Sequence, residues 1–168
     1  MSTAVRVTCG LRIFNVALSL AIAALIFVGP GFCHEVVQKT MTCNNHLYVS
    51  NWVGIQIWLQ MVPIAVAVFG AVFMCLCSLP NISNHEMSNV VGQVIVSVVF
   101  IILYLLCAGT EYYYSRHFLN QHHPYSVAGA NFYNYDAYVI GWIVAAGLYI
   151  LMAGIQLLDT IFTYSSSR

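Results

Sequence analysis

The chain has 168 residues, of which 61% are hydrophobic and only 6% are charged, and its formal net charge is zero. A soluble domain usually carries about 25% charged residues, so the surface cannot face water throughout. Because no run of Lys or Arg is present, nucleic acid is also excluded as a partner. We therefore expect an integral membrane protein whose main solvent is the lipid bilayer.

Four apolar stretches without a charged side chain follow one another along the chain. They run approximately from Ile13 to Gly29, Val53 to Cys77, Val90 to Ala108 and Ala137 to Leu158. Each is close to the roughly 20 residues that a helix needs to cross a hydrocarbon core of about 30 Å. A membrane barrel strand would instead alternate apolar and polar residues. The sequence thus predicts an all-α fold, with residues 1–168 forming one antiparallel, up-and-down bundle of four transmembrane helices.

The cations near the ends of these stretches predict the orientation in the membrane. The termini carry three and the first and third loops carry two: Arg6, Arg12 and Arg168 against Lys39 and Arg116. We expect both termini and the loop from Ser78 to Asn89 in the cytoplasm, with the other two loops outside. Val28-Gly29-Pro30-Gly31 is a poor signal-peptidase site, so the first stretch is expected to remain as a span.

The triplet Asn81-Ile82-Ser83 is a sequon for N-glycosylation. It lies in the loop that is predicted to be cytoplasmic, and glycosylation takes place on the lumenal side. The predicted orientation therefore requires Asn81 to be unmodified, and a glycan there would invert the topology.

The cysteines fall into two groups. Cys33 and Cys43 are ten residues apart in the first outer loop, where an oxidising exterior favours a disulfide over the alternative of two unpaired thiols. Cys9, Cys75 and Cys77 lie at the predicted inner ends of the first two spans. Such juxtamembrane cysteines are candidates for palmitoylation, and the alternative is that they are small buried side chains.

The third loop is rich in aromatic residues, most of them tyrosines. Tyrosine provides rigid contact area with a polar tip, which suits the headgroup layer or a protein contact. A belt of aromatic side chains in the headgroup layer explains Tyr112 to Tyr114 and Tyr138. The middle of the loop fits a contact surface for another protein better. The candidate contact residues are Tyr125, Phe132, Tyr133 and Tyr135.

Polar residues within the four stretches are neutral and are expected to form hydrogen bonds between helices: Asn15, Ser19, Gln56, Gln60, Gln93, Ser97 and Gln156. The pairs Ala17/Ala21, Ala67/Ala71 and Gly141/Ala145 have the small-xxx-small spacing that allows close helix packing. Carboxyl groups are expected only at helix ends, as Glu111 and Asp159. His117, His122 and His123 lack a neighbouring carboxylate or thiol at ligand spacing, so no metal site is expected. No phosphate loop or catalytic triad is present, and we expect neither an enzyme nor a cofactor.

Four spans with short ends and a compact inner loop resemble the MARVEL-type and claudin-like tetraspan proteins of junctions and vesicles. The claudin signature of two tryptophans followed by two cysteines is not met, because Trp52 follows Cys33 and Cys43. Stretches similar to the Snakeskin family of insect septate junction proteins are Asn89-Val90-Val91-Gly92, Leu148-Tyr149 and Leu157-Leu158-Asp159-Thr160. This resemblance implies a role in an epithelial barrier, alongside other membrane proteins.

The expected function is therefore that of a non-enzymatic protein that organises cell–cell junctions through lateral helix packing and its outer loops. Its expected partners are the lipid bilayer and other membrane proteins, including junction components or further copies of the same chain. Two alternatives stay open at this point: a vesicle tetraspan that sorts lipid and cargo, and an auxiliary subunit of a channel or transporter.

Overall fold

The computed structural model describes residues 3–36, 40–48, 60–117, 125–127, 130–132 and 137–165. Four helices are long and apolar enough to cross a membrane, which confirms the predicted all-α four-helix bundle. The helices are α1 (Thr3–Val28), α3 (Met61–Leu76) with the short α4 (Leu79–Asn84), α5 (Val90–His117) and α6 (Ile140–Ser165). The strands are β1 (Pro30–Val36), β2 (Thr40–His46), β3 (Tyr125–Val127), β4 (Ala130–Phe132) and β5 (Ala137–Val139).

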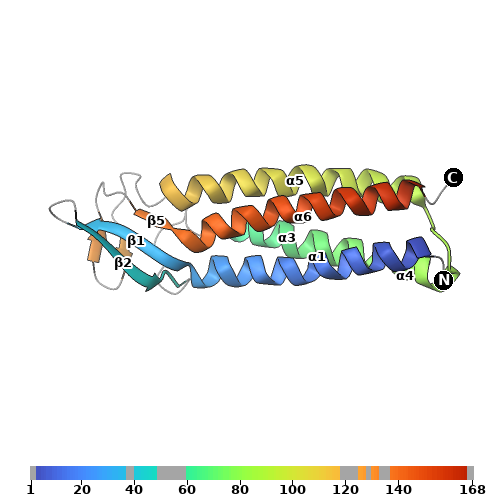
Figure 1. Ribbon diagram of the computed structural model, residues 1–168. Coiled ribbons are helices and arrows are strands. Elements are labelled where there is room, and N and C mark those ends of the chain that lie inside the picture. The colour runs from blue at the N-terminus through green and yellow to red at the C-terminus, as the bar shows by residue number, and fades with distance from the viewer. Residues whose placement is uncertain are drawn as a thin grey trace.

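The long helices lie side by side with alternating direction, and each packs against two neighbours, in the ring α1–α3–α5–α6 (Figure 1). The N-terminus, the C-terminus and α4 lie together at one end of the bundle, which we call the terminal end (Figure 1). The strands β1, β2 and β5 lie at the opposite end, which we call the sheet end (Figure 1). The chain is thus an up-and-down bundle with both ends on the same side.

Three of the helices, α1, α5 and α6, extend beyond the apolar stretches at the terminal end or the sheet end. Helix α1 begins at Thr3, ten residues before Ile13, and at about 1.5 Å per residue its 26 residues span about 39 Å. Helix α6 likewise continues to Ser165, past Leu158. These added turns bring Arg12 and Asp159 into the bundle, although the sequence places them at or beyond the edges of the spans.

The second predicted span is described only from position 60, with α3 over Met61–Leu76. The predicted start of the fourth span at Ala137 is wrong, because Ala137–Val139 pair with β1 as strand β5 and the helix begins at Ile140.

Polar side chains are buried in the bundle beside an apolar core that includes Trp142 and Met74, and many large apolar side chains also lie on the outer surface. Arg12, Asn15, Gln156 and Asp159 are each at most 1% exposed. The outer surface carries large apolar side chains on every long helix, among them Leu20, Phe69, Val91, Leu106, Ile150 and Leu157. An apolar outer surface of this extent would be costly in water, and it suits a bundle surrounded by lipid. The chain is a multi-pass membrane protein.

Small residues allow the closest helix contacts, as two of the three predicted pairs show. Ala67 and Ala71 are fully buried on α3, and Gly141 and Ala145 are buried on α6. The predicted Ala17/Ala21 pair is different, because both residues are exposed on the outer surface of α1. The small-xxx-small spacing therefore does not by itself predict which helix face packs against another helix of the same chain.

The sheet end is assembled from two loops that are far apart in the sequence. Its three strands are antiparallel in the order β2-β1-β5, with β5 pairing Phe32↔Val139, Cys33↔Tyr138 and His34↔Ala137. Gly29, at φ +52°, ends α1, and its carbonyl oxygen accepts a hydrogen bond from the backbone N–H of Leu47, at 2.9 Å. Trp142 Nε1 donates to the carbonyl oxygen of Ile26 at 3.2 Å, which satisfies one free carbonyl group at the end of α1. The sheet is thereby attached directly to α1 and α6.

Candidate functional site

A buried ion pair lies in the half of the bundle nearest the terminal end. Arg12 Nε donates to both carboxylate oxygens of Asp159, at 3.1 Å and 3.0 Å, and both side chains are 1% exposed. Arg12 is on α1 and Asp159 on α6, so the pair joins the first and last spans. Charged groups are costly within a membrane, and pairing inside the bundle is the arrangement in which they are tolerated.

The guanidinium group of Arg12 extends these contacts to a third helix segment. Its Nη1 donates to the carbonyl oxygen of Met74 at 3.3 Å and to Oγ of Ser78 at 3.1 Å. Its Nη2 lies 3.5 Å from Oγ1 of Thr163 on α6. Arg12 therefore joins α1 to the α3–α4 segment and to α6. A lysine, with a single ammonium group, could not contact all of these partners at once.

Gln156 connects the ion pair to the fourth helix. Its Oε1 accepts a hydrogen bond from Asn15 Nδ2 at 3.2 Å, and its Nε2 donates to Ser97 Oγ at 2.6 Å. Ser97 also lies 2.6 Å from the hydroxyl of Thr160. The expected role of Asn15, Ser97 and Gln156 in joining helices is confirmed, whereas Ser19 bonds within α1, to the carbonyl oxygen of Val16. We call this set of bonds around Arg12, Gln156 and Asp159 the polar network.

A second polar cluster lies nearer the sheet end, on α5 and its neighbours. The Gln60 amide lies 2.6 Å and 3.2 Å from the two carboxyl oxygens of Glu111, and both residues are fully buried. Tyr104 of α5 and Tyr149 of α6 are also fully buried, and their hydroxyl groups have no hydrogen-bond partner in the described part of the chain. Cys107 is also buried, four residues before Glu111 on the same face of α5. We call these residues the Glu111 cluster. Gln56, which the sequence pairs with Gln60, lies outside the described residues.

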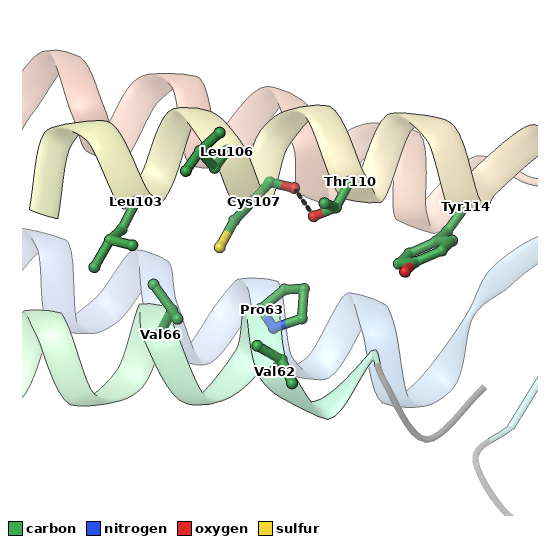
Figure 2. A pocket seen from close by; sticks show the side chains of 8 residues that line it. All are labelled: Val62, Pro63, Val66, Leu103, Leu106, Cys107, Thr110 and Tyr114. Atoms are coloured by element: carbon green, nitrogen blue, oxygen red, sulfur yellow. Dashed lines mark hydrogen bonds between the residues drawn. The ribbon is translucent and has the colours of Figure 1, made fainter. Parts of the chain in front are cut away.

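A groove between α3 and α5 runs beside this cluster. Figure 2 shows that its walls are apolar side chains of α3 (Val62, Pro63 and Val66) facing Leu103, Leu106 and Cys107 of α5, with Thr110 and Tyr114 further along α5. The Thr110 hydroxyl donates to the carbonyl oxygen of Cys107 at 2.9 Å (Figure 2). Pro63 lies in the first turn of α3, where a missing N–H breaks no bond within the helix. The groove suits an apolar chain.

The predicted disulfide Cys33–Cys43 is present at the sheet end. The two cysteines are directly opposite each other in the β1/β2 ladder, so the hairpin register places them side by side. The bridge therefore ties the two longest strands of the sheet together.

The aromatic loop is described only in part. Tyr125 on β3 and Phe132 on β4 are register partners in a two-stranded hairpin, whereas Tyr133 and Tyr135 lie outside the described residues. The same holds for His122 and His123. In the part of the chain that the structure describes, no three His, Cys, Asp or Glu side chains are grouped as metal ligands.

The candidate palmitoylation sites Cys9, Cys75 and Cys77 are half-buried, and all three belong to helix segments that reach the terminal end. Cys107 is a further free cysteine, buried in α5.

Asn81 of the sequon, in the segment that connects α3 to α5, is 1% exposed and forms hydrogen bonds there. Its Nδ2 donates to Gln93 Oε1 at 3.2 Å, and its Oδ1 accepts from the backbone N–H of Ser88 at 2.8 Å. Gln93 Nε2 returns a bond to Asn81 Oδ1 at 3.1 Å. A glycan on Nδ2 would replace the bond to Gln93 and does not fit this buried position.

The ion pair and the Glu111 cluster were not predicted from the sequence, for one reason. Segments chosen by continuous apolar character end before the first charged residue, so they exclude Arg12 and Asp159 by definition. A spacing signal was available, because Arg12 and Asn15 are three residues apart, as are Gln156 and Asp159, and each pair shares one helix face.

In comparisons with known proteins, the chain matches no protein-family model, no curated protein and no solved structure.

Proposed function

We propose that this multi-pass membrane protein is a non-enzymatic organiser of cell–cell junctions or of an epithelial barrier. In this proposal the sheet end faces the exterior and presents the contact surface, while the bundle packs laterally against other membrane proteins or further copies. The observation that carries the proposal is the joining of two loops, distant in sequence, into one disulfide-tied sheet attached to a rigid bundle.

The orientation in this proposal is supported by the chemistry of the two ends. Disulfides persist in oxidising compartments, which favours an exterior position for the sheet end with Cys33 and Cys43. The terminal end then faces the cytoplasm with the two termini and α4. The buried position of Asn81 agrees with this orientation, because a cytoplasmic sequon receives no glycan. Cys9, Cys75 and Cys77 would also lie where cytoplasmic acylation takes place.

Lateral association is supported by the outer surface between α5 and α6. A second groove there is lined partly by small residues that leave the helix backbones accessible: Ala108 and Gly109 of α5, and Ala146 and Gly147 of α6. A Cβ atom added at Gly109 or Gly147 would meet no atom of this chain within 4 Å. Close approach of a neighbouring transmembrane helix at such small residues is a common mode of association in lipid.

The test is imaging and barrier measurement in a polarised epithelium, with wild-type protein beside the variant Tyr125→Ser/Tyr133→Ser/Tyr135→Ser. We expect wild-type protein at lateral cell contacts, and we expect the variant to insert normally but to weaken adhesion and raise paracellular leak. The control is Tyr112→Ser/Tyr164→Ser, which changes two exposed tyrosines outside the middle of the loop.

Unchanged adhesion and leak in the triple variant would remove the aromatic loop from the mechanism. Punctate internal staining of the wild type would contradict the junction role and favour a trafficking tetraspan. Stable co-purification with a large pore-forming protein would favour an auxiliary subunit instead.

A further inference from the structure

Among the described residues, the carboxyl groups of Glu111 and Asp159 are buried, and their surroundings differ in one decisive respect. Asp159 contacts a guanidinium group at 3.0 Å, whereas the described contacts of Glu111 are with a neutral amide. An ionised carboxylate without a cation is very costly in a low-dielectric interior, so such a group takes up a proton instead. The difference in partners therefore predicts different charge states for the two groups.

In the described part of the chain, no cation forms an ion pair with Glu111. The cation of its own helix, Arg116, is exposed, and its guanidinium lies 5.8 Å from the centre of the Tyr112 ring. Tyr104 and Cys107 lie seven and four residues before Glu111 on the same face of α5, and Tyr149 of α6 is buried beside them. All three are weak acids that become negative when they ionise. Helix α3 contains no Asp, Glu, Lys, Arg or His between Met61 and Leu76.

Arg12 is too far away to compensate a charge on Glu111. It contacts Met74, which follows Gln60 by fourteen residues in a helical segment, and this corresponds to about 21 Å along the bundle. Arg6 lies still nearer to the N-terminal end of α1. A carboxylate at position 111 would thus remain unpaired among the described side chains of the neighbouring helices.

The Gln60 amide and Glu111 are close enough for a hydrogen bond in either charge state. The shorter separation between them is 2.6 Å. O–H···O bonds reach about 2.5 Å, and the N–H···O bond from Gln156 Nε2 to Ser97 Oγ in this bundle is also 2.6 Å. A carboxylic acid O–H can therefore donate to the amide oxygen at this distance, and it is the lack of a paired cation that favours the neutral acid.

We propose that Glu111 binds a proton in the folded bundle and donates it in a hydrogen bond to Oε1 of Gln60, which makes this carboxyl group a buried proton-binding site. When the proton leaves to water, a carboxylate remains, and the Gln60 amide turns so that Nε2 becomes the donor. The site is independent of the junction role proposed above, because it depends only on the packing of α3, α5 and α6.

The bond has a consequence for the contact between α3 and α5. Gln60 is the residue directly before α3, so the bond to Glu111 joins the start of α3 to α5. The adjoining groove separates the same two helices. It is lined by Cys107, one turn before Glu111, and by Thr110, which directly precedes Glu111 (Figure 2). Loss of the proton would leave a carboxylate without a cation at this contact, which is costly in a low-dielectric interior. The groove also gives apolar reagents a route from the lipid toward Glu111.

The sign of the pH effect follows from this charge state. A carboxyl group that is protonated when buried and ionised when exposed binds more protons in the folded state. Stability then falls as the pH rises, and the ratio of unfolded to folded protein increases by up to about tenfold per pH unit while one proton is released on unfolding.

The test uses the full chain in lipid nanodiscs. Infrared spectroscopy at neutral pH is expected to show the carbonyl stretch of one protonated carboxylic acid, which disappears in Glu111→Gln and remains in the control Asp159→Asn. Absence of this band from the wild type would overturn the proposal, and so would its persistence in folded Glu111→Gln.

A second measurement needs no substitution, and it applies even if Glu111→Gln fails to fold. Dicyclohexylcarbodiimide is an apolar reagent that reacts with protonated carboxyl groups. The acid O–H adds across a C=N bond, and rearrangement gives a stable N-acylurea without loss of any atom. Wild-type protein that shows the infrared band is treated with the reagent and analysed by mass spectrometry. We expect the adduct on Glu111, and we expect its yield to decrease as the pH is raised. An adduct confined to another carboxyl group would overturn the proposal.

Discussion

Replacing Arg12 with leucine should strongly destabilise the bundle. The variant leaves Asp159 buried without its cation, and the remaining contact is Gln156 Nε2 at 3.5 Å. Removing one partner of a buried ion pair costs about 3–5 kcal/mol. The carbonyl group of Met74 and the hydroxyl of Ser78 also lose a donor. Against a total stability of about 5–15 kcal/mol, this loss is large.

A double-mutant cycle separates the charge effect from the loss of packing. Arg12→Leu and Asp159→Leu are each expected to lower the free energy of unfolding by about 3–5 kcal/mol. The double variant removes both charges and is expected to be more stable than either single variant, because no unpaired charge remains in the interior. The matched control is Arg6→Leu, since Arg6 is an exposed arginine of the same helix.

The assay is reversible unfolding of purified protein in bicelles, which gives the free energy of unfolding directly. We expect a strong coupling between positions 12 and 159 and a small effect at position 6. Additive effects of the two single changes, or an Arg6→Leu cost equal to that of Arg12→Leu, would refute the assignment of a structural ion pair.

Three further predictions concern other contacts. Cys33→Ser should abolish the thiol-protected form on non-reducing gels and cost about 3 kcal/mol, because the short closed loop is released in the unfolded state; an unchanged alkylation pattern would mean that the bridge does not form in cells. Treatment with a glycosidase should not change the gel mobility of the protein, because Asn81 carries no glycan. Asn81→Ala should lower the free energy of unfolding by about 1–3 kcal/mol, because it leaves buried polar groups unpaired. Neither result is expected if the loop faces the lumen. Gly70→Ala should destabilise by about 1–3 kcal/mol through overpacking, since a Cβ there would lie 2.6 Å from the Tyr104 hydroxyl, while Gly109→Ala should be neutral in the monomer; equal stability of the two variants would contradict the packing described.

The number and direction of the helices could be predicted from the sequence because each span is a continuous apolar run of the length that a bilayer requires. The disulfide could also be predicted, from the spacing of Cys33 and Cys43 within one loop. Both inferences depend on local composition, and both agree with the structure.

The remaining features depend on contacts between distant residues, which local composition does not encode. The pairing of β5 with β1 joins residues more than a hundred positions apart. Arg12 counted as a loop cation in the sequence, yet α1 continues through it because its charge is matched by Asp159 on α6. Glu111 likewise belongs to the core because α5 extends past Ala108 and turns this carboxyl group toward Gln60.

The accessibility of tags in intact cells tests the proposed topology directly. We propose four spans with both termini on the cytoplasmic side and the sheet end outside. Tags at the two termini should bind antibody only after the membrane is permeabilised, whereas a tag inserted between positions 120 and 124 should be stained on intact cells. Staining of a single terminus, or of both termini without permeabilisation, would contradict this arrangement.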